Sequence, residues 1–202
     1  MVKTFIAPLA LFLLAACGAT QSPRASTDGA RPTETFRAHH AEIKNKLDDA
    51  AAHAMALSSA TPEEASELFH RIVHFFHHEL IPHAEAEERI LYAAADRLVQ
   101  TAHGRRYTDA LRYEHTVIAR QVQALHAAMQ RDDRSPEAID EFQRRTLELV
   151  GLIDAHFGVE ENVVLTAFDE QMSAEEFDRE VVQPMHAESG GAAHHHGEHA
   201  HE

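Results

Sequence analysis

Two short stretches of the 202-residue chain decide the fold: HAEAEE at positions 83–88 and HFGVEE at positions 156–161. Each places a histidine and a glutamate four residues apart, so that on a helix both side chains project from one face, a turn apart. Both stretches lie on the apolar stripe of a long segment with helical spacing. An ionised carboxylate buried there without compensation is costly, so something positive is expected beside each pair.

The segments around these stretches have the pattern of helices and show no strand alternation. Apolar residues at helical spacing predict helices over about 34–57, 61–98, 108–129 and 135–168. Thr61-Pro62 and Ser135-Pro136 supply an N-cap followed by a proline suited to the first helical position. Pro82 is expected to kink the second helix, and a capping box at 173–176 predicts a last short helix. The expected fold is all-α, a four-helix bundle with a short C-terminal extra helix.

An internal repeat relates the two halves of this bundle. The matched residues are Thr61 with Ser135, His40 with His115, His83 with His156, and Glu87 with Glu160. The shifts agree within about two residues, as a duplicated helical hairpin predicts. Residue counts also place the histidines on either side of each connection at similar depths, roughly 30 Å along the bundle at about 1.5 Å per residue.

These features predict a metal site with six protein ligands. The candidates are His40, His83, Glu87, His115, His156 and Glu160. Two carboxylates that bridge two cations, with imidazoles in the remaining positions, would compensate the buried charge. Such a donor set suits iron or manganese better than a closed structural zinc site, although zinc stays open. The alternative is a bundle whose buried His/Glu pairs are hydrogen-bonded without metal.

The motifs HAEI at 40–43, EHTVI at 114–118 and the two stretches quoted first resemble the hemerythrin HHE cation-binding domain over about residues 34–168. The resemblance implies an up-and-down four-helix bundle. It also implies a carboxylate-bridged di-iron centre, with Glu87 and Glu160 as bridges and the four histidines as terminal ligands. Oxygen-binding members carry a fifth histidine one turn from the third-helix ligand, whereas Leu111 and Ala119 occupy those positions here. This difference argues against reversible oxygen carriage.

Other histidines are candidates for the missing ligand, namely His74, His77, His78 and His126. On a straight helix the first three point away from the His83 face, and the last lies about three turns from His115. None is therefore expected in the centre, and His39 is expected to face solvent.

Four further side chains near the motifs have open roles. Glu88 and Glu161 each follow a proposed ligand, as surface charge or as support for imidazole N–H groups. Tyr92 and Tyr113 serve either as redox partners of the centre or in packing.

The ends of the chain predict export and anchoring. Residues 1–17 resemble a lipoprotein signal peptide whose only cysteine, Cys17, would be lipidated; an ordinary signal peptide with an incidental cysteine is the alternative. Residues 18–33 form a tether, 34–170 the bundle, 171–186 the extra helix, and 187–202 a His-rich tail. The tail offers further imidazoles for weak metal binding: His194, His195, His196, His199 and His201.

The net charge disfavours one class of partner, and the motifs and chain ends predict a function. The formal charge of -15 disfavours nucleic acid as a partner. The expected protein is anchored in the bacterial cell envelope, facing the periplasm from the outer membrane if the cell is Gram-negative. It is expected to hold two iron ions, with manganese or zinc as alternatives, and to bind or sense oxygen, nitric oxide or peroxide. The alternative functions are those of a di-iron oxidoreductase that handles nitric oxide and of a metal-storage protein.

Overall fold

The computed structural model describes residues 31–101 and 104–192, with side chains as far as Ala187. Every regular element in this part of the chain is helical, which confirms the all-α prediction. The expected signal peptide, Cys17 and the histidines of the tail lie outside the described residues. Among the described helices, none is both long enough and apolar enough to cross a membrane.

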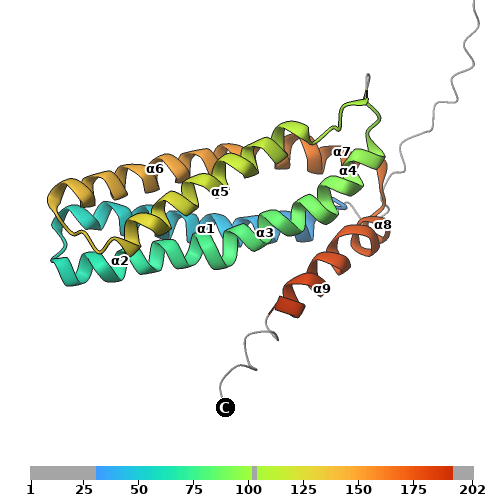
Figure 1. Cartoon of the computed structure of the whole chain (residues 1–202). Coiled ribbons are helices and arrows are strands. Elements are labelled where there is room, and N and C mark those ends of the chain that lie inside the picture. Colours follow the sequence, from blue (N-terminus) through green and yellow to red (C-terminus); the bar gives the residue numbers. More distant parts are fainter. Residues whose placement is uncertain (1–30, 102–103, 193–202) are drawn as a thin grey trace, which may run out of the picture.

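Four long helices form the bundle, and three of them contain or adjoin shorter turns (Figure 1). The first is α1 (Glu34–Ala56), followed by a 3-10 turn at Leu57–Ser59. The second consists of α2 (Pro62–Phe75), α3 (Ile81–Ala86) and α4 (Tyr92–Leu98), joined by π-helical turns at Phe76–Leu80 and Glu87–Leu91. The third is α5 (Asp109–Gln130). The fourth joins α6 (Pro136–Val159) to α7 (Leu165–Gln171) through a π-helical turn at Glu160–Val164.

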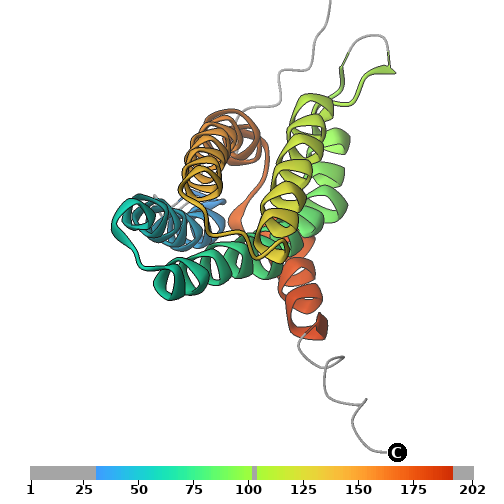
Figure 2. The same cartoon turned by 60° about the vertical axis from the view of Figure 1, so that its left-hand side comes forward.

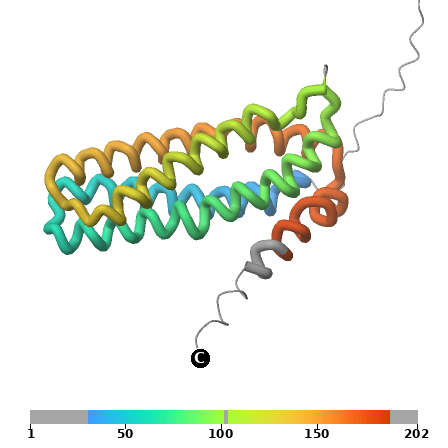
Figure 3. The backbone as a smooth tube through the Cα atoms, viewed as in Figure 1, coloured from blue at the N-terminus to red at the C-terminus, as the bar shows by residue number. Residues whose placement is uncertain are grey.

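The helices run up and down the bundle in sequence order, as the tube view shows (Figure 3). Helix α1 packs against α2 and α6, and α5 packs against the same two helices, which closes the bundle. A shorter C-terminal unit follows, made of α8 (Ala174–Phe177), a π-helical turn at Asp178–Val182 and α9 (Gln183–Ala192). It lies across the side of the second helix, where α9 contacts α3 (Figure 2).

The predicted helix starts are confirmed by their caps. Thr61 forms a capping box with Glu64, because the Glu64 N–H donates to Thr61 Oγ1 at 3.3 Å and the Thr61 N–H donates to Glu64 Oε2 at 2.8 Å. Ser135 Oγ accepts from the N–H of Ala138 at 3.3 Å. Ser173 begins α8 with a second capping box.

Two features add to the expected helices. The second helix continues through Pro82, as expected, and a π-helical turn directly precedes it. Because Pro82 has no N–H to donate to the preceding turn, a wider turn at this point accommodates the missing hydrogen bond. The C-terminal unit also continues to Ala192, beyond the expected boundary, since Ala187 and Glu188 favour helix.

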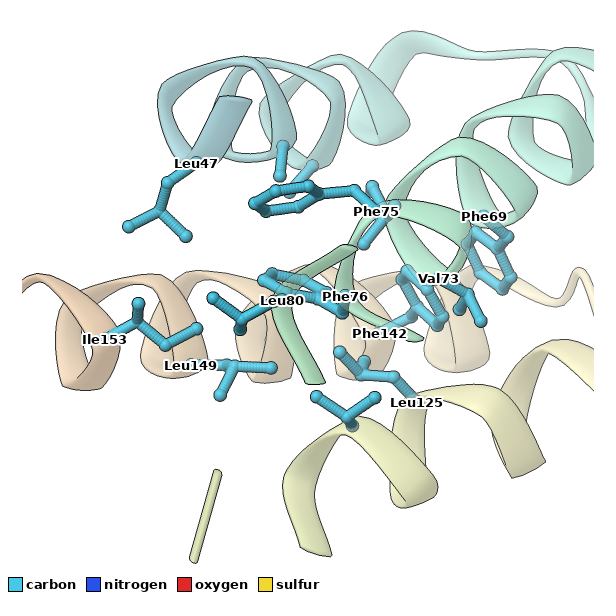
Figure 4. Close-up of a cluster of buried hydrophobic side chains, with 14 of the residues drawn as sticks. Leu47, Phe69, Val73, Phe75, Phe76, Leu80, Leu125, Phe142, Leu149 and Ile153 are labelled. Atoms are coloured by element: carbon cyan, nitrogen blue, oxygen red, sulfur yellow. The ribbon is translucent and has the colours of Figure 1, made fainter. Parts of the chain in front are cut away.

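Two apolar clusters fill the bundle, one toward each end. The first is centred on Phe69, Phe76 and Phe142, and the rings of Phe69 and Phe142 stack with centroids 3.6 Å apart (Figure 4). The second contains Phe168 and Phe177, so the C-terminal unit adds to the core through its buried aromatic ring. Along each long helix the residues of one cluster give way to those of the other, and buried polar side chains lie between them.

Candidate metal centre

Six buried polar side chains converge between the two apolar clusters. They are the six that the sequence singles out, with exposed fractions of 8% or less: His40, His83, Glu87, His115, His156 and Glu160. Four helices supply them, since His40 lies on α1, His115 on α5 and the two His/Glu pairs on the second and fourth helices. Each glutamate is the first residue of a π-helical turn.

The six residues form two groups that share Glu87. In the first group, Glu87 Oε1 lies 2.8 Å from His83 Nε2 and 3.0 Å from His40 Nε2. In the second group, donor atoms of Glu87, His115, His156 and Glu160 all lie within 4.8 Å of one another. Glu87 turns its other oxygen, Oε2, toward His115 Nε2 at 3.5 Å. Its two oxygens therefore face different groups, which is the geometry of a bridging carboxylate.

Carboxylates behind three of the imidazoles orient the rings. Glu88 Oε1 lies 3.1 Å from His115 Nδ1, and Glu114 Oε2 lies 2.9 Å from His156 Nδ1. Glu161 Oε1 lies 3.5 Å from His40 Nδ1, and this contact, opposed by burial and aided by Lys44, lowers the pKa of Glu161 to about 2. Of the two roles considered for Glu88 and Glu161, the contacts favour imidazole support. In His115 and His156 the carboxylates hold the proton of the ring on Nδ1 and leave Nε2 as a free lone pair.

The ligand atoms are placed to bind a cation rather than to form hydrogen bonds with one another. His115 Nε2 and His156 Nε2 lie 2.9 Å apart, although the carboxylates on their Nδ1 atoms leave both as acceptors. His83 Nε2 lies close to Glu87 Oε1 but not in hydrogen-bond geometry, and Glu160 Oε2 is likewise buried without a hydrogen-bond partner. Buried lone pairs that face each other without a donor are unfavourable, whereas a metal ion between them would satisfy all of them.

The pKa shifts of the two glutamates also indicate a cation in the cluster. Burial, together with the neighbouring charge of Glu87, raises the pKa of Glu160 well above its usual value. Burial also opposes ionisation of Glu87, but His83 and His40 lower its pKa well below the usual value. Two carboxylates in this enclosed space cannot both ionise without additional positive charge. The cluster thus fits a metal site.

Tyr92 adds a hydroxyl to the second group. Its side chain is fully buried, and its Oη donates to Glu160 Oε1 at 2.5 Å and lies 3.3 Å from His115 Nε2. Burial and then the charge of Glu160 raise the pKa of Tyr92, so the phenol is a proton donor here. Tyr113, the other tyrosine considered, is 65% exposed and takes no part.

The π-helical turn explains why helical periodicity does not place Tyr92 in the centre. Tyr92 follows Glu87 by five residues, which in an α-helix puts the two side chains on different faces. In the π-helical segment Glu87–Leu91, one turn takes about five residues, more than in an α-helix. Two residues that are five apart therefore lie on the same side of the helix. The sequence signal for this contact is an aromatic residue five positions after a proposed metal ligand.

The histidines considered as a replacement ligand lie elsewhere, as expected. His74, His77 and His78 are exposed, and His77 of the second helix contacts His126 of α5, with ring centroids 5.2 Å apart. His39 is exposed, as expected, with 52% of its side chain accessible to solvent. Its ring also packs edge-on against His83, with centroids 5.1 Å apart.

Comparison with known proteins gives one family. The family model described as the hemerythrin HHE cation binding domain matches residues 31–168. No curated protein and no solved structure matches the chain significantly. The matched range contains all six residues of the cluster and Tyr92, and it ends before α8.

Proposed function

Since the chain belongs to the hemerythrin HHE cation-binding family, we propose that its buried cluster holds two iron ions. Glu87 and Glu160 would bridge the two ions, and the four histidines would each take a terminal position. The observation that carries this assignment is the 2.9 Å approach of His115 Nε2 and His156 Nε2, two acceptors that need a cation between them. The unpartnered His83 Nε2 and Glu160 Oε2 support it independently.

The donor chemistry favours iron over zinc. Six imidazole and carboxylate donors around two positions, with no thiolate, suit a metal that accepts more than four ligands. When bound, a pair of irons in this environment supplies open coordination positions for a small molecule and a reversible change of oxidation state.

We infer that the protein binds or senses oxygen, nitric oxide or peroxide. The chain prepares the centre for a small ligand by placing it between two apolar clusters, which close the bundle on either side of it. Tyr92 Oη lies among His115, His156 and Glu160, where it can donate a hydrogen bond to a ligand. The same proton donor favours a second candidate function, a di-iron oxidoreductase, which predicts turnover of peroxide or nitric oxide with an added reductant.

The cellular setting is also proposed from the sequence. The lipobox-like ending at Cys17 supports an envelope lipoprotein. Replacement of Cys17 by serine should release the protein from the membrane fraction without changing its iron content.

Metal analysis tests the central proposal. The whole chain, produced with iron supplied, should contain about two irons per molecule. A variant with alanine at all five tail histidines, residues 194–196, 199 and 201, should contain the same tightly bound amount. Loss of most iron from the tail variant would contradict the assignment and favour storage in the tail, and a chain that holds no iron would exclude a di-iron centre.

A further inference from the structure

A cavity of about 570 Å³ leads from the surface to the first group of the centre. It opens between α1 and α3, and the C-terminal unit covers one side of it through Val182 of the π-helical turn and Met185 and His186 of α9. His83 forms part of its inner wall and, at 8%, is the most exposed of the six cluster residues. The covering helix lies beyond the residues that match the family model. The cavity is therefore shaped by a segment that the family domain does not include.

The lining of this cavity is unusually rich in metal-binding side chains. Four histidines line it: His39, His78 and His186, which are exposed, and His83, which is buried. Three carboxylates stand among them, those of Glu42, Glu79 and Glu85. Two cations also line the cavity, and each pairs with one of these carboxylates, Lys46 with Glu79 and Arg89 with Glu85. A hydrated cation loses water only where other donors replace it, so a series of imidazoles and carboxylates allows stepwise passage.

His83 differs from its repeat partner in a way that suits exchange. In the second half, His156 Nδ1 is held by Glu114 at 2.9 Å. The residue that corresponds to Glu114 in the first half is His39, whose ring contacts His83 instead. His83 thus has a second potential ligand beside it where His156 has an anchoring carboxylate.

The opposite groove is a poorer route. It measures about 350 Å³ and reaches His115 between α3 and α5. Its lining contains one histidine, His115, whose Nδ1 already faces Glu88 Oε1 at 3.1 Å, together with Glu85, Glu88 and Arg120. A single imidazole offers fewer exchangeable donors than the four that line the larger cavity.

We propose that the cavity beneath α9 is the entry port through which a divalent first-row transition metal ion, Fe²⁺ above all, reaches the centre, with His39 passing the ion to His83. This inference rests on the proposed function, because it requires a metal at His40, His83 and Glu87. The C-terminal unit then serves to assemble the port, since it contributes His186 at the rim.

The rate of metal uptake tests the port. Metal-free whole chain is mixed with Co²⁺, and the visible absorbance of the bound ion is followed with time. Only the part of the absorbance that is absent in the Glu87→Ala variant is assigned to Co²⁺ bound in the centre. His39→Ala and His186→Ala should each slow filling by about tenfold while the final amount bound stays the same. His70→Ala removes an exposed imidazole of α2 outside the cavity lining and should fill at the unaltered rate.

The possible outcomes distinguish failure of the entry port from failure of the proposed metal centre. Unchanged rates in both cavity variants would overturn the port, as would equal slowing by His70→Ala. His186 lies on α9, outside the four bundle helices that supply the six cluster residues, so its variant still tests the port if His39→Ala disturbs His83. If the unaltered chain shows no Co²⁺ signal that depends on Glu87, the metal centre itself is wrong and the port falls with it.

Discussion

The first and second halves of the bundle repeat the same contacts where their helices begin. In the first half, the Thr33 N–H and hydroxyl donate to Asp169 Oδ1 at 3.0 Å and 2.8 Å, and Arg37 Nη2 lies 3.0 Å from Asp169 Oδ2. Arg37 Nε also donates to Thr33 Oγ1 at 2.9 Å. This network fastens the start of α1 to α7, the end of the other half.

The second half uses the corresponding residues in the same way. The Thr108 N–H and hydroxyl both donate to Asp96 Oδ1 at 3.0 Å, and Arg112 Nη2 lies 3.2 Å from Asp96 Oδ2. Here the start of α5 is fastened to α4, again across the halves. Glu88 and Glu161 follow the same rule, because each supports a histidine of the opposite half.

The halves differ near the centre. Tyr92 of the first half corresponds to Leu165 of the second, and His39 corresponds to Glu114. As a result, the second group carries a phenol and anchored imidazoles, whereas the first group adjoins a histidine-lined cavity. A duplicated scaffold has thus acquired two unlike positions, and we infer a division between ligand binding at one and metal entry at the other.

The largest expected effect comes from the residue that both groups share. Glu87→Ala should abolish the dinuclear centre, because it removes a donor from each group. Glu160→Ala should also lose the pair of ions, since it removes the second bridge. Iron analysis of the purified variants checks this, and retention of two irons by the Glu87 variant would remove the basis for a shared bridge.

The equivalent histidines His40 and His115 should respond to pH in opposite ways in the metal-free protein. Although burial opposes it, hydrogen bonds to Glu161 and Glu87 raise the pKa of His40 to about 9. Burial, as the main cause, lowers the pKa of His115. Protonated His40 therefore stabilises the fold below about pH 6.5, and this contribution is lost as the pH rises through about 9.

The expected loss is about 3 kcal/mol, because each pKa unit corresponds to about 1.4 kcal/mol. Urea unfolding of the metal-free chain between pH 6 and 9.5 measures it. His40→Asn should flatten this part of the profile, whereas His115→Asn should leave it in place. A profile that stays steep in the His40 variant would assign the effect to another group.

Matched substitutions test the symmetry of the scaffold. Asp169→Ala and Asp96→Ala each leave a partly buried arginine and a threonine without their acceptor. Each should lower the free energy of unfolding by about 2 kcal/mol, and by similar amounts, because the two networks are alike. Denaturant titration provides the comparison, and a large difference between the variants would show that the halves are not equivalent in energy.

The smallest effect is expected at the position where the halves diverge. Tyr92→Phe removes one hydroxyl and its hydrogen bond to Glu160, while the ring keeps its packing. Iron content should stay the same, and azide, used as a probe of the open position, should bind about tenfold more weakly. Spectroscopic titration with azide measures this change. Equal affinity would mean that Tyr92 only fills space.

Much of the fold was predictable from local patterns. Apolar spacing and the caps at Thr61, Ser135 and Ser173 located the helices, because these signals act within a few residues of the chain. The repeat singled out the six residues that the structure brings together, since a duplicated hairpin repeats its inward face. Pro82 was the weak point, because a single missing N–H can be absorbed by a kink or by a π-helical turn.

Taken alone, the sequence determined the helical class, the helix starts and the six converging side chains, because periodicity and capping are properties of neighbouring residues. Tertiary structure alone decided that Tyr92 enters the centre, that Glu114 anchors His156 and that α9 covers a cavity beside His83. The first depends on a change of helical phase, and the others on contacts between segments far apart in the chain. Such contacts are set by how whole helices pack, which no local pattern records.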